Sequence, residues 1–294
     1  MDLSRGVRRI TTGTDGMKRA TLNGITLEYE AAGAGEPVVC IHGAFVADTF
    51  RPLLAEPSLA ERYQLVTYHR RGYAGSGHTP GPTSIAQQAA DCRNLLGRLG
   101  IGRAHVVGHS FGAIVALQLA LDAPEIVHSL VLIEPGLPIG DGAETYREAL
   151  ARGRERYREV GAEEVVAEFL RARWPGYRDP LDRALPGAFA QAVADAKTWF
   201  EAEVAAQLAW RFGEAEARRI TRPALSVLGG ESAALWARFG ETHRWLLATL
   251  PRGEGLVLPG ATHFPQFQNP RGLAEGLADF FARHPLAAQP CPAG

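Results

Sequence analysis

A pentapeptide in the first half of the chain places a serine between two glycines. Gly108-His109-Ser110-Phe111-Gly112 follows an apolar run and opens a helical pattern. A serine on a tight strand-to-helix turn is held in a strained backbone conformation, and the positions two residues away must carry almost no side chain. The start of the helix also brings backbone N–H groups and a positive dipole end to the reacting centre. The pattern predicts that Ser110 is a nucleophile, with an N-capping serine as the alternative.

A serine nucleophile needs a base, and His263 is the candidate. It lies in Leu258–Phe264 (LPGATHF), a loop between the last predicted strand and the C-terminal helical pattern. The order serine, acid, histidine along the chain is one of those known for serine hydrolases. His42, in IHGAF, is a second candidate, but we expect it to brace its own loop.

That loop follows a buried strand and can direct a backbone N–H at a developing oxyanion. The second donor would be the N–H of the residue after the nucleophile. We therefore predict that the amides of Ala44 and Phe111 form an oxyanion hole, with an ordinary glycine turn as the alternative.

Two glutamates compete for the role of the acid that orients His263. Glu134 closes the apolar run LVLI, and Glu231 follows the apolar run ALSVL. A carboxylate at the end of a buried strand needs a partner, because an unpaired buried charge is costly. We favour Glu134, with Glu231 as the alternative acid, and interpret Asp91 and Asp122 as surface residues.

Short apolar runs alternate with helical patterns along most of the chain. This alternation predicts an α/β fold, a mostly parallel sheet with helices on both faces. The predicted strands are Ile25–Glu30 at an antiparallel edge, then Pro37–Ile41, Gln64–Tyr68, Ala104–Gly108, Leu130–Ile133, Ala224–Leu228 and Gly255–Leu258. The predicted helices are Ser84–Leu99, Phe111–Leu121, Ala237–Leu250 and Arg271–Ala282.

One interval, residues 136–219, has helical patterns, many aromatic residues and no convincing strand. We predict that it is a helical cap over Ser110, inserted into a core made of residues 18–135 and 220–284. Most of its aromatic side chains should form the cap's own core, and a minority should line an apolar pocket. Residues 1–17 and 285–294 are predicted to be loose termini.

Composition excludes several classes of protein. The net charge is −1 over 294 residues and no half is strongly basic, so nucleic acid is not an expected partner. Three widely spaced cysteines predict neither a disulfide framework nor a metal site. The polar N-terminus and the absence of a long apolar run favour a cytoplasmic protein without a membrane partner.

Four of these motifs resemble those of one large family. HGAF, YHRRGYAGSG, GHSFG and GATHF are similar, in order and spacing, to motifs of the α/β-hydrolase superfamily, in its capped single-domain branch. The resemblance covers Thr21–His284. It implies the α/β-hydrolase fold, a cap after the sixth strand, and hydrolysis through an acyl-enzyme without a cofactor or metal.

The acid departs from the usual pattern of that family. Members usually carry aspartate three residues after the glycine that ends the seventh strand, and Ser232 occupies this position here. Haloalkane dehalogenases resemble this arrangement, since several place a glutamate after strand six, where Glu134 lies. Ser110 argues against their chemistry, which uses an aspartate nucleophile.

The residues together predict a hydrolase of carboxylic esters or lactones that acts on a small, largely apolar substrate. Two alternatives stay open. The same three residues could catalyse acyl transfer, perhydrolysis or carbon–carbon bond hydrolysis, or the cleft could bind a ligand without catalysis.

Overall fold

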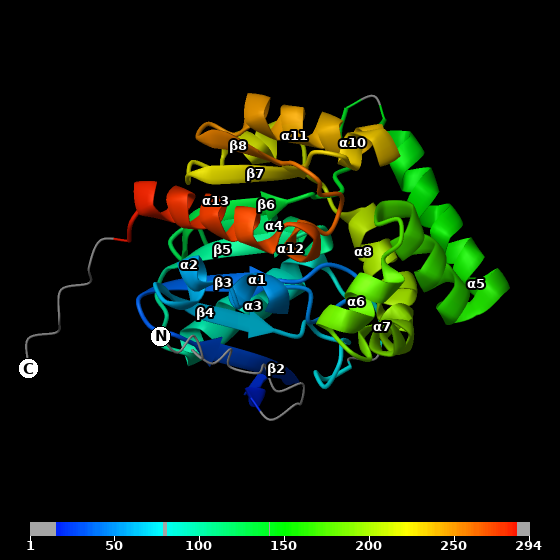
Figure 1. Cartoon of the computed structure of the whole chain (residues 1–294), viewed down its shortest axis with the longest axis horizontal. Coiled ribbons are helices and arrows are strands. Elements are labelled where there is room, and N and C mark those ends of the chain that lie inside the picture. The colour runs from blue at the N-terminus through cyan, green and yellow to red at the C-terminus, as the bar shows by residue number, and fades with distance from the viewer. Residues whose placement is uncertain (1–15, 79–80, 141, 287–294) are drawn as a thin grey trace, which may run out of the picture.

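The computed structural model describes residues 16–78, 81–140 and 142–286, so most of the predicted loose termini lie outside the described residues (Figure 1). Within this range the chain forms an eight-stranded sheet with the order β1-β2-β4-β3-β5-β6-β7-β8. The strands are β1 (Lys18–Leu22), β2 (Ile25–Ala32), β3 (Glu36–Ile41), β4 (Tyr63–Tyr68), β5 (Ala104–His109), β6 (Val127–Ile133), β7 (Ala224–Gly229) and β8 (Gly253–Leu258). From β4 to β8 in this order all pairs are parallel, which confirms the predicted fold class.

The edge of the sheet differs from the prediction. Strand β2, predicted as the edge, pairs antiparallel with β4 on one side and with β1 on the other, so β1 is the edge. Asn23 and Gly24 join β1 to β2 with φ of 48° and 81°. An Asn-Gly pair with two positive φ angles is typical of a tight hairpin turn, and this local signal identifies the missed strand.

Helices cover both faces of the sheet and enclose two apolar cores. One face carries α3 (Ile85–Arg98), α4 (Phe111–Asp122) and α11 (Ala237–Thr249). The other carries α1 (Arg51–Leu54), α2 (Pro57–Ala60) and α13 (Pro270–Arg283). Two short helices, α10 (Ser232–Leu235) and α12 (Pro265–Gln268), follow β7 and β8. Among the described residues, no helix is both long and apolar enough to cross a membrane.

The predicted cap segment, residues 136–219, is helical and has no strand in its described part. It contains α5 (Ala143–Arg173), α6 (Arg178–Ala184), α7 (Ala188–Lys197), the π-helix η2 (Thr198–Glu203), α8 (Val204–Ala209) and α9 (Glu214–Arg218). Figure 1 shows α5 to α8 grouped beyond one end of the sheet, on the right.

Helix α5 is two helical arms rather than one rod. Gly161 interrupts it with φ of 81° and ψ of 177°. Arg156, before the break, donates to Glu168, after it, at 2.7 Å. Twelve residues of straight helix would span about 18 Å, so this bond requires the arms to fold back beside each other.

One residue interpreted as a surface group is buried. Asp91 on α3 is 3% exposed and accepts two hydrogen bonds from the guanidinium of Arg71, at 2.6 and 2.7 Å. A forked arginine is a favoured partner for a buried carboxylate, and the pairing explains how an acidic residue occupies the inner face of α3. Asp122 is exposed, as predicted.

Candidate active site

The loops with the predicted catalytic residues begin at the same edge of the sheet. Parallel pairing sets Ile41 beside Gly108, and Ile133 beside both His109 and Val227. The carboxyl ends of β3, β5, β6 and β7 therefore coincide, which is where open α/β sheets commonly bind ligands.

Ser110 lies on the turn between β5 and α4 with φ of 53° and ψ of −116°. A positive φ is rare for a residue other than glycine, and the surrounding structure must hold it. A Cβ atom at Gly108 would meet the backbone of Ala113, and one at Gly112 would meet the carbonyl oxygen of Ile41. Both glycines are therefore needed for the close approach of strand, turn and helix.

His263 approaches Ser110 from the loop between β8 and α12. Its Nε2 lies 3.0 Å from the Oγ of Ser110, within hydrogen-bond distance. Nε2 of His109 lies 2.7 Å from the backbone carbonyl oxygen of His263 and bonds to it, and the ring of Phe239 stacks on the imidazole with centroids 4.6 Å apart. The ring and the backbone of His263 are thus both held in place.

Glu134, rather than Glu231, reaches the other ring nitrogen of His263. Its Oε2 lies 3.2 Å from Nδ1 of His263, and its Oε1 accepts a hydrogen bond from the N–H of Gly229 at 2.6 Å. Glu134 itself has a φ of 49°, so the turn after β6 is held in the left-handed region too. Glu231 is exposed, and its side chain makes no hydrogen bond among the described residues.

Burial shifts the pKa values of both Glu134 and His263. It raises the pKa of Glu134 to about 7, although hydrogen bonds such as that from Gly229 oppose the shift. Burial, and then the positive charge of Arg173, lower the pKa of His263 below its ordinary value. A lowered pKa keeps the imidazole neutral near pH 7, which is the form that can accept a proton from Ser110.

The loop after β3 is bent sharply next to the serine. Phe45 has a φ of 67°, and the N–H of Val46 donates to the carbonyl of Ala44 at 2.9 Å. The amides of Ala44 and Phe111 donate no hydrogen bond within the described part of the chain. Two free backbone donors beside a serine hydroxyl are the arrangement that an oxyanion hole requires.

His42 and Arg70 hold the loop after β3 in place through hydrogen bonds. The N–H of Arg70 donates to Nε2 of His42 at 2.9 Å, so Nδ1 carries the proton and donates to the carbonyl of Gly43 at 2.8 Å. The guanidinium of Arg70 donates to the carbonyl oxygens of His42 and Gly43 at 2.9 and 2.8 Å. His42 has both nitrogens engaged and, as expected, is structural.

The same arginine connects the loop to the predicted cap segment. Arg70 is 1% exposed and forms an ion pair with Glu203 of η2, which also accepts from the hydroxyl of Tyr73 at 2.6 Å. Gln88 of α3 accepts a hydrogen bond from Arg70 and donates one to Glu203. Arg70 lies within the motif YHRRGYAGSG, which by itself assigns it no role. Nothing local in the sequence connects it to Glu203.

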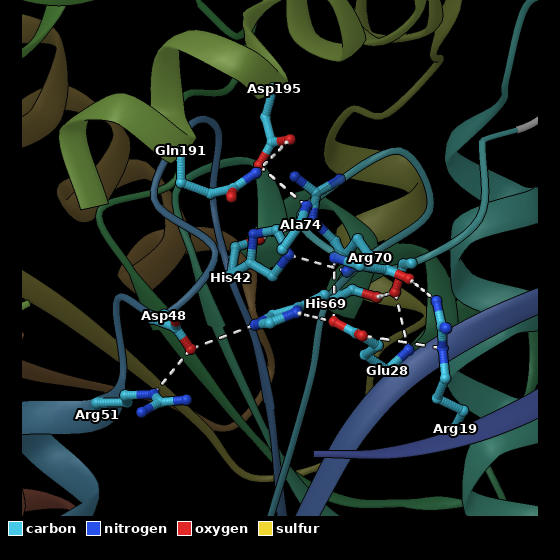
Figure 2. A network of polar contacts seen from close by, with 12 residues as sticks. Arg19, Glu28, His42, Asp48, Arg51, His69, Arg70, Ala74, Gln191 and Asp195 are labelled. Atoms are coloured by element: carbon cyan, nitrogen blue, oxygen red, sulfur yellow. Dashed lines mark hydrogen bonds and ion pairs between the residues drawn. The ribbon is translucent and has the colours of Figure 1, made fainter. Parts of the chain in front are cut away.

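A second polar network, shown in Figure 2, fixes the chain that follows β4. His69 lies between Asp48 and Glu28, with both ring nitrogens 3.2 Å from carboxylate oxygens. Burial alone would lower the pKa of His69, but the hydrogen bonds and charges of the two carboxylates raise it. Asp195 of α7 accepts from the N–H of Ala74 at 3.0 Å, a second link between core and cap.

A cavity of about 240 Å³ opens between the two arms of α5 and the segments facing them. Its walls are mainly aromatic and aliphatic. They include Tyr146, Phe169 and Arg173 of α5, Trp199 and Phe200 of η2, and Trp236.

Comparison with known proteins gives partial sequence matches and full-length structural ones. The chain is 40% identical over 108 residues to a protein from Azorhizobium caulinodans named provisionally as a carbamate hydrolase, a match that covers 36% of this chain and 40% of that protein. It is 37% identical over 139 residues to the dihydrolipoyllysine-residue acetyltransferase component of an acetoin cleaving system from Cupriavidus necator, covering 47% of this chain and 37% of that protein. The chain thus spans about two fifths of the length of these relatives.

The enol-lactonase of Burkholderia xenovorans has the same fold, with a TM-score of 0.77, 22% identity, and coverage of 90% of this chain and 100% of that one. The model of the alpha/beta hydrolase family matches residues 38–276, which include Ser110, His263, Glu134 and the loop that contains Ala44. This protein therefore belongs to the alpha/beta hydrolase family.

Proposed function

We propose that this protein is a serine hydrolase that cleaves a carboxylic ester or lactone through an acyl-enzyme. One observation carries the proposal: a continuous chain of contacts joins Ser110 Oγ to His263 Nε2 at 3.0 Å and His263 Nδ1 to Glu134 Oε2 at 3.2 Å. The three side chains come from three loops at one edge of the sheet, and this geometry supports the roles of nucleophile, base and orienting acid.

In the proposed first step, the oxygen of Ser110 attacks the substrate carbonyl while His263 Nε2 takes the hydroxyl proton. Charge develops on the carbonyl oxygen, which the free amides of Ala44 and Phe111 would bind. Glu134 holds the Nδ1 proton and stabilises the imidazolium. Collapse of the intermediate breaks the bond to the alkoxy oxygen, which leaves with the proton from His263.

In the second step, water attacks the acyl-enzyme. His263 takes a proton from the water, and the tetrahedral intermediate collapses with return of that proton to Ser110. The carboxylic acid leaves and the enzyme regains its starting state. The links of Arg70 to the loop carbonyls and to Glu203 support a role for residues 136–219 as a cap that helps to shape this site.

The test is a screen of p-nitrophenyl esters of increasing chain length, lactones and carbamates, with Ser110→Ala as the blank. We expect turnover of at least one ester or lactone by the native protein and none above the blank by the variant. Adding a competing alcohol or hydrogen peroxide separates hydrolysis from acyl transfer and perhydrolysis. Tight binding without turnover of any substrate would overturn the proposal in favour of a binding protein.

A further inference from the structure

The cavity between the arms of α5, called the cap cavity below, contains a cation that pairs with no carboxylate among the described residues. Arg173, the last residue of α5, lines the cavity and donates one hydrogen bond, from Nη1 to the carbonyl of Phe169 at 3.3 Å. Its guanidinium carbon lies 3.6 Å from the ring centroid of Phe169 and 5.4 Å from that of Trp236. Among the described residues it forms no ion pair, so most of its five N–H donors have no partner.

A partly buried guanidinium without an ion-pair partner is unusual in a protein. Arg173 is half-buried, and the surrounding protein removes part of the water that would solvate its charge, so burial lowers its pKa to about 10. It remains charged near pH 7. Charges in such surroundings are normally paired, because an unpaired one is costly. A ligand anion in the cavity would supply the missing partner.

A second arginine in the same cavity provides the contrast. Arg156 is exposed and forms a forked pair with Glu168, with its Nη2 and Nε at 2.7 and 3.1 Å from the carboxylate oxygens. Glu168 is the acidic residue in the cavity wall, and Arg156 already occupies it. The cavity therefore has one neutralised arginine at its edge and one that is not neutralised.

The cavity adjoins the reacting groups through single aromatic rings. Trp199, in its wall, contacts Phe111 with ring centroids 5.5 Å apart. Trp236, also in the wall, contacts Phe239 at 5.2 Å, and Phe239 stacks on His263. One layer of aromatic rings therefore separates the cavity from Ser110 and His263, and a substrate that spans both must pass its chain between these rings.

We propose that Arg173 anchors a carboxylate of the substrate, so that this site selects an ester or lactone that also carries a free carboxylate. This inference rests on the proposed hydrolase function. The aromatic walls would contact the apolar chain between the two ends, and the guanidinium would bind the carboxylate through two parallel N–H···O bonds. It refines the expected apolar substrate to an apolar chain with one anionic end.

The kinetic test uses pairs of p-nitrophenyl esters of equal length, one with a terminal carboxylate and one with a terminal methyl ester, over spacers of two to six methylenes. The variants are Arg173→Met and Arg173→Lys, with Arg156→Met as the control in the same cavity. We expect Arg173→Met to lower kcat/KM for the carboxylate ester by about 10- to 100-fold, mainly through KM. At a pH above the acid limb of the profile, kcat/KM for the neutral ester should change by less than about threefold, and Arg173→Lys should retain part of the preference.

A binding measurement separates the anchor from catalysis. In the Ser110→Ala background, calorimetry with the monomethyl ester of adipate should detect binding that the added Arg173→Met change removes and Arg156→Met retains. Equal losses on both esters, or unchanged binding without Arg173, would overturn the anchor while leaving the hydrolase proposal intact. If the hydrolase proposal were wrong and the anchor correct, the native protein would bind the adipate monoester but turn over none of the esters.

Discussion

Arg70 contacts the predicted cap segment through Glu203, and Arg173 lies in that segment beside Trp236, but the protein surrounds the two arginines differently. The guanidinium of Arg70 binds Glu203, Gln88 and two loop carbonyls, and these contacts fix the backbone of the loop after β3. Arg173 lines a cavity, and among the described residues its one hydrogen-bond partner is the carbonyl of Phe169. A cation with all its partners in the protein positions the catalytic loop, whereas a cation that lacks them is available to a ligand.

The two arginines lie in different parts of the proposed site. We call the loops that carry Ser110, His263, Glu134 and Ala44 the catalytic floor, and Arg173 lies in the cap cavity. Changes in the floor should lower turnover of every substrate alike. Changes in the cavity should alter selection among substrates.

The largest effect should follow removal of the nucleophile or the base. Ser110→Ala and His263→Ala should each abolish nearly all esterase activity, by a factor that approaches ~10⁶ in kcat in the best-studied serine hydrolases. The double variant should be no worse than either single one, because the residues act as a unit. Steady-state kinetics on the best ester checks this. A substantial fraction of activity left in Ser110→Ala would mean that another group attacks the substrate.

Substitution of the proposed acid, Glu134, should have the next largest effect on kcat. Glu134→Gln keeps the shape of the side chain but no longer favours the correct tautomer of His263, and the cost can approach ~10⁴ in kcat. Glu231→Gln is the matched control, and the exposure of Glu231 predicts a change of no more than a few-fold. The reverse ranking, measured on the same ester, would transfer the role of acid to Glu231.

The link between floor and cap should affect stability more than selection. Glu203→Gln leaves the buried guanidinium of Arg70 without its counter-charge, and breaking a buried pair typically costs about 3–5 kcal/mol. Denaturant unfolding should show a loss of this order, with kcat/KM for carboxylate and neutral esters falling by the same factor.

The control for that link is the double variant Arg70→Met, Glu203→Gln. Its loss of stability should be smaller than the sum of the two single losses, because neither charge is then left unpaired. Additive losses would show that the two side chains do not act as a pair.

Local signals were sufficient to predict much of the floor. The apolar runs gave the buried strands, and the two glycines around Ser110 predicted a turn whose positive φ and close approach the structure shows. Glu134 was favoured because a carboxylate at a buried strand end needs a partner, and it lies beside His263. Each of these inferences depends on a few consecutive residues, where steric and burial requirements leave few alternatives.

The features that were missed depend on tertiary folding. Arg70 and Glu203 meet only because η2 packs over the loop after β4, and no sequence spacing indicates that contact. Arg173 lines a cavity because α5 folds back at Gly161, and the helical patterns expected over residues 136–219 do not indicate where the chain folds back. Asp91 is buried against Arg71, which lies on a different element, and the helical segment around Asp91 does not by itself indicate that contact.

The smallest expected effect is a shift in pH dependence, and it tests how close Arg173 lies to the floor. Burial and then the charge of Arg173 lower the pKa of His263, and only neutral His263 can accept the serine proton. Arg173→Met removes a positive charge that disfavours the imidazolium, so the pKa of His263 should rise. The acid limb of the kcat/KM profile should then move to higher pH.

A neutral ester is the substrate for this measurement, because its own ionisation does not change across the profile. Arg156→Met, which removes a charge already paired with Glu168 at the edge of the cavity, should leave the acid limb in place. An acid limb that moves to lower pH in Arg173→Met would contradict the expected sign of the interaction, and one that stays fixed would mean that the two groups do not interact. The cap cavity would then be electrostatically separate from the catalytic floor, and a carboxylate held by Arg173 would lie too far from Ser110 to belong to the reacting ester.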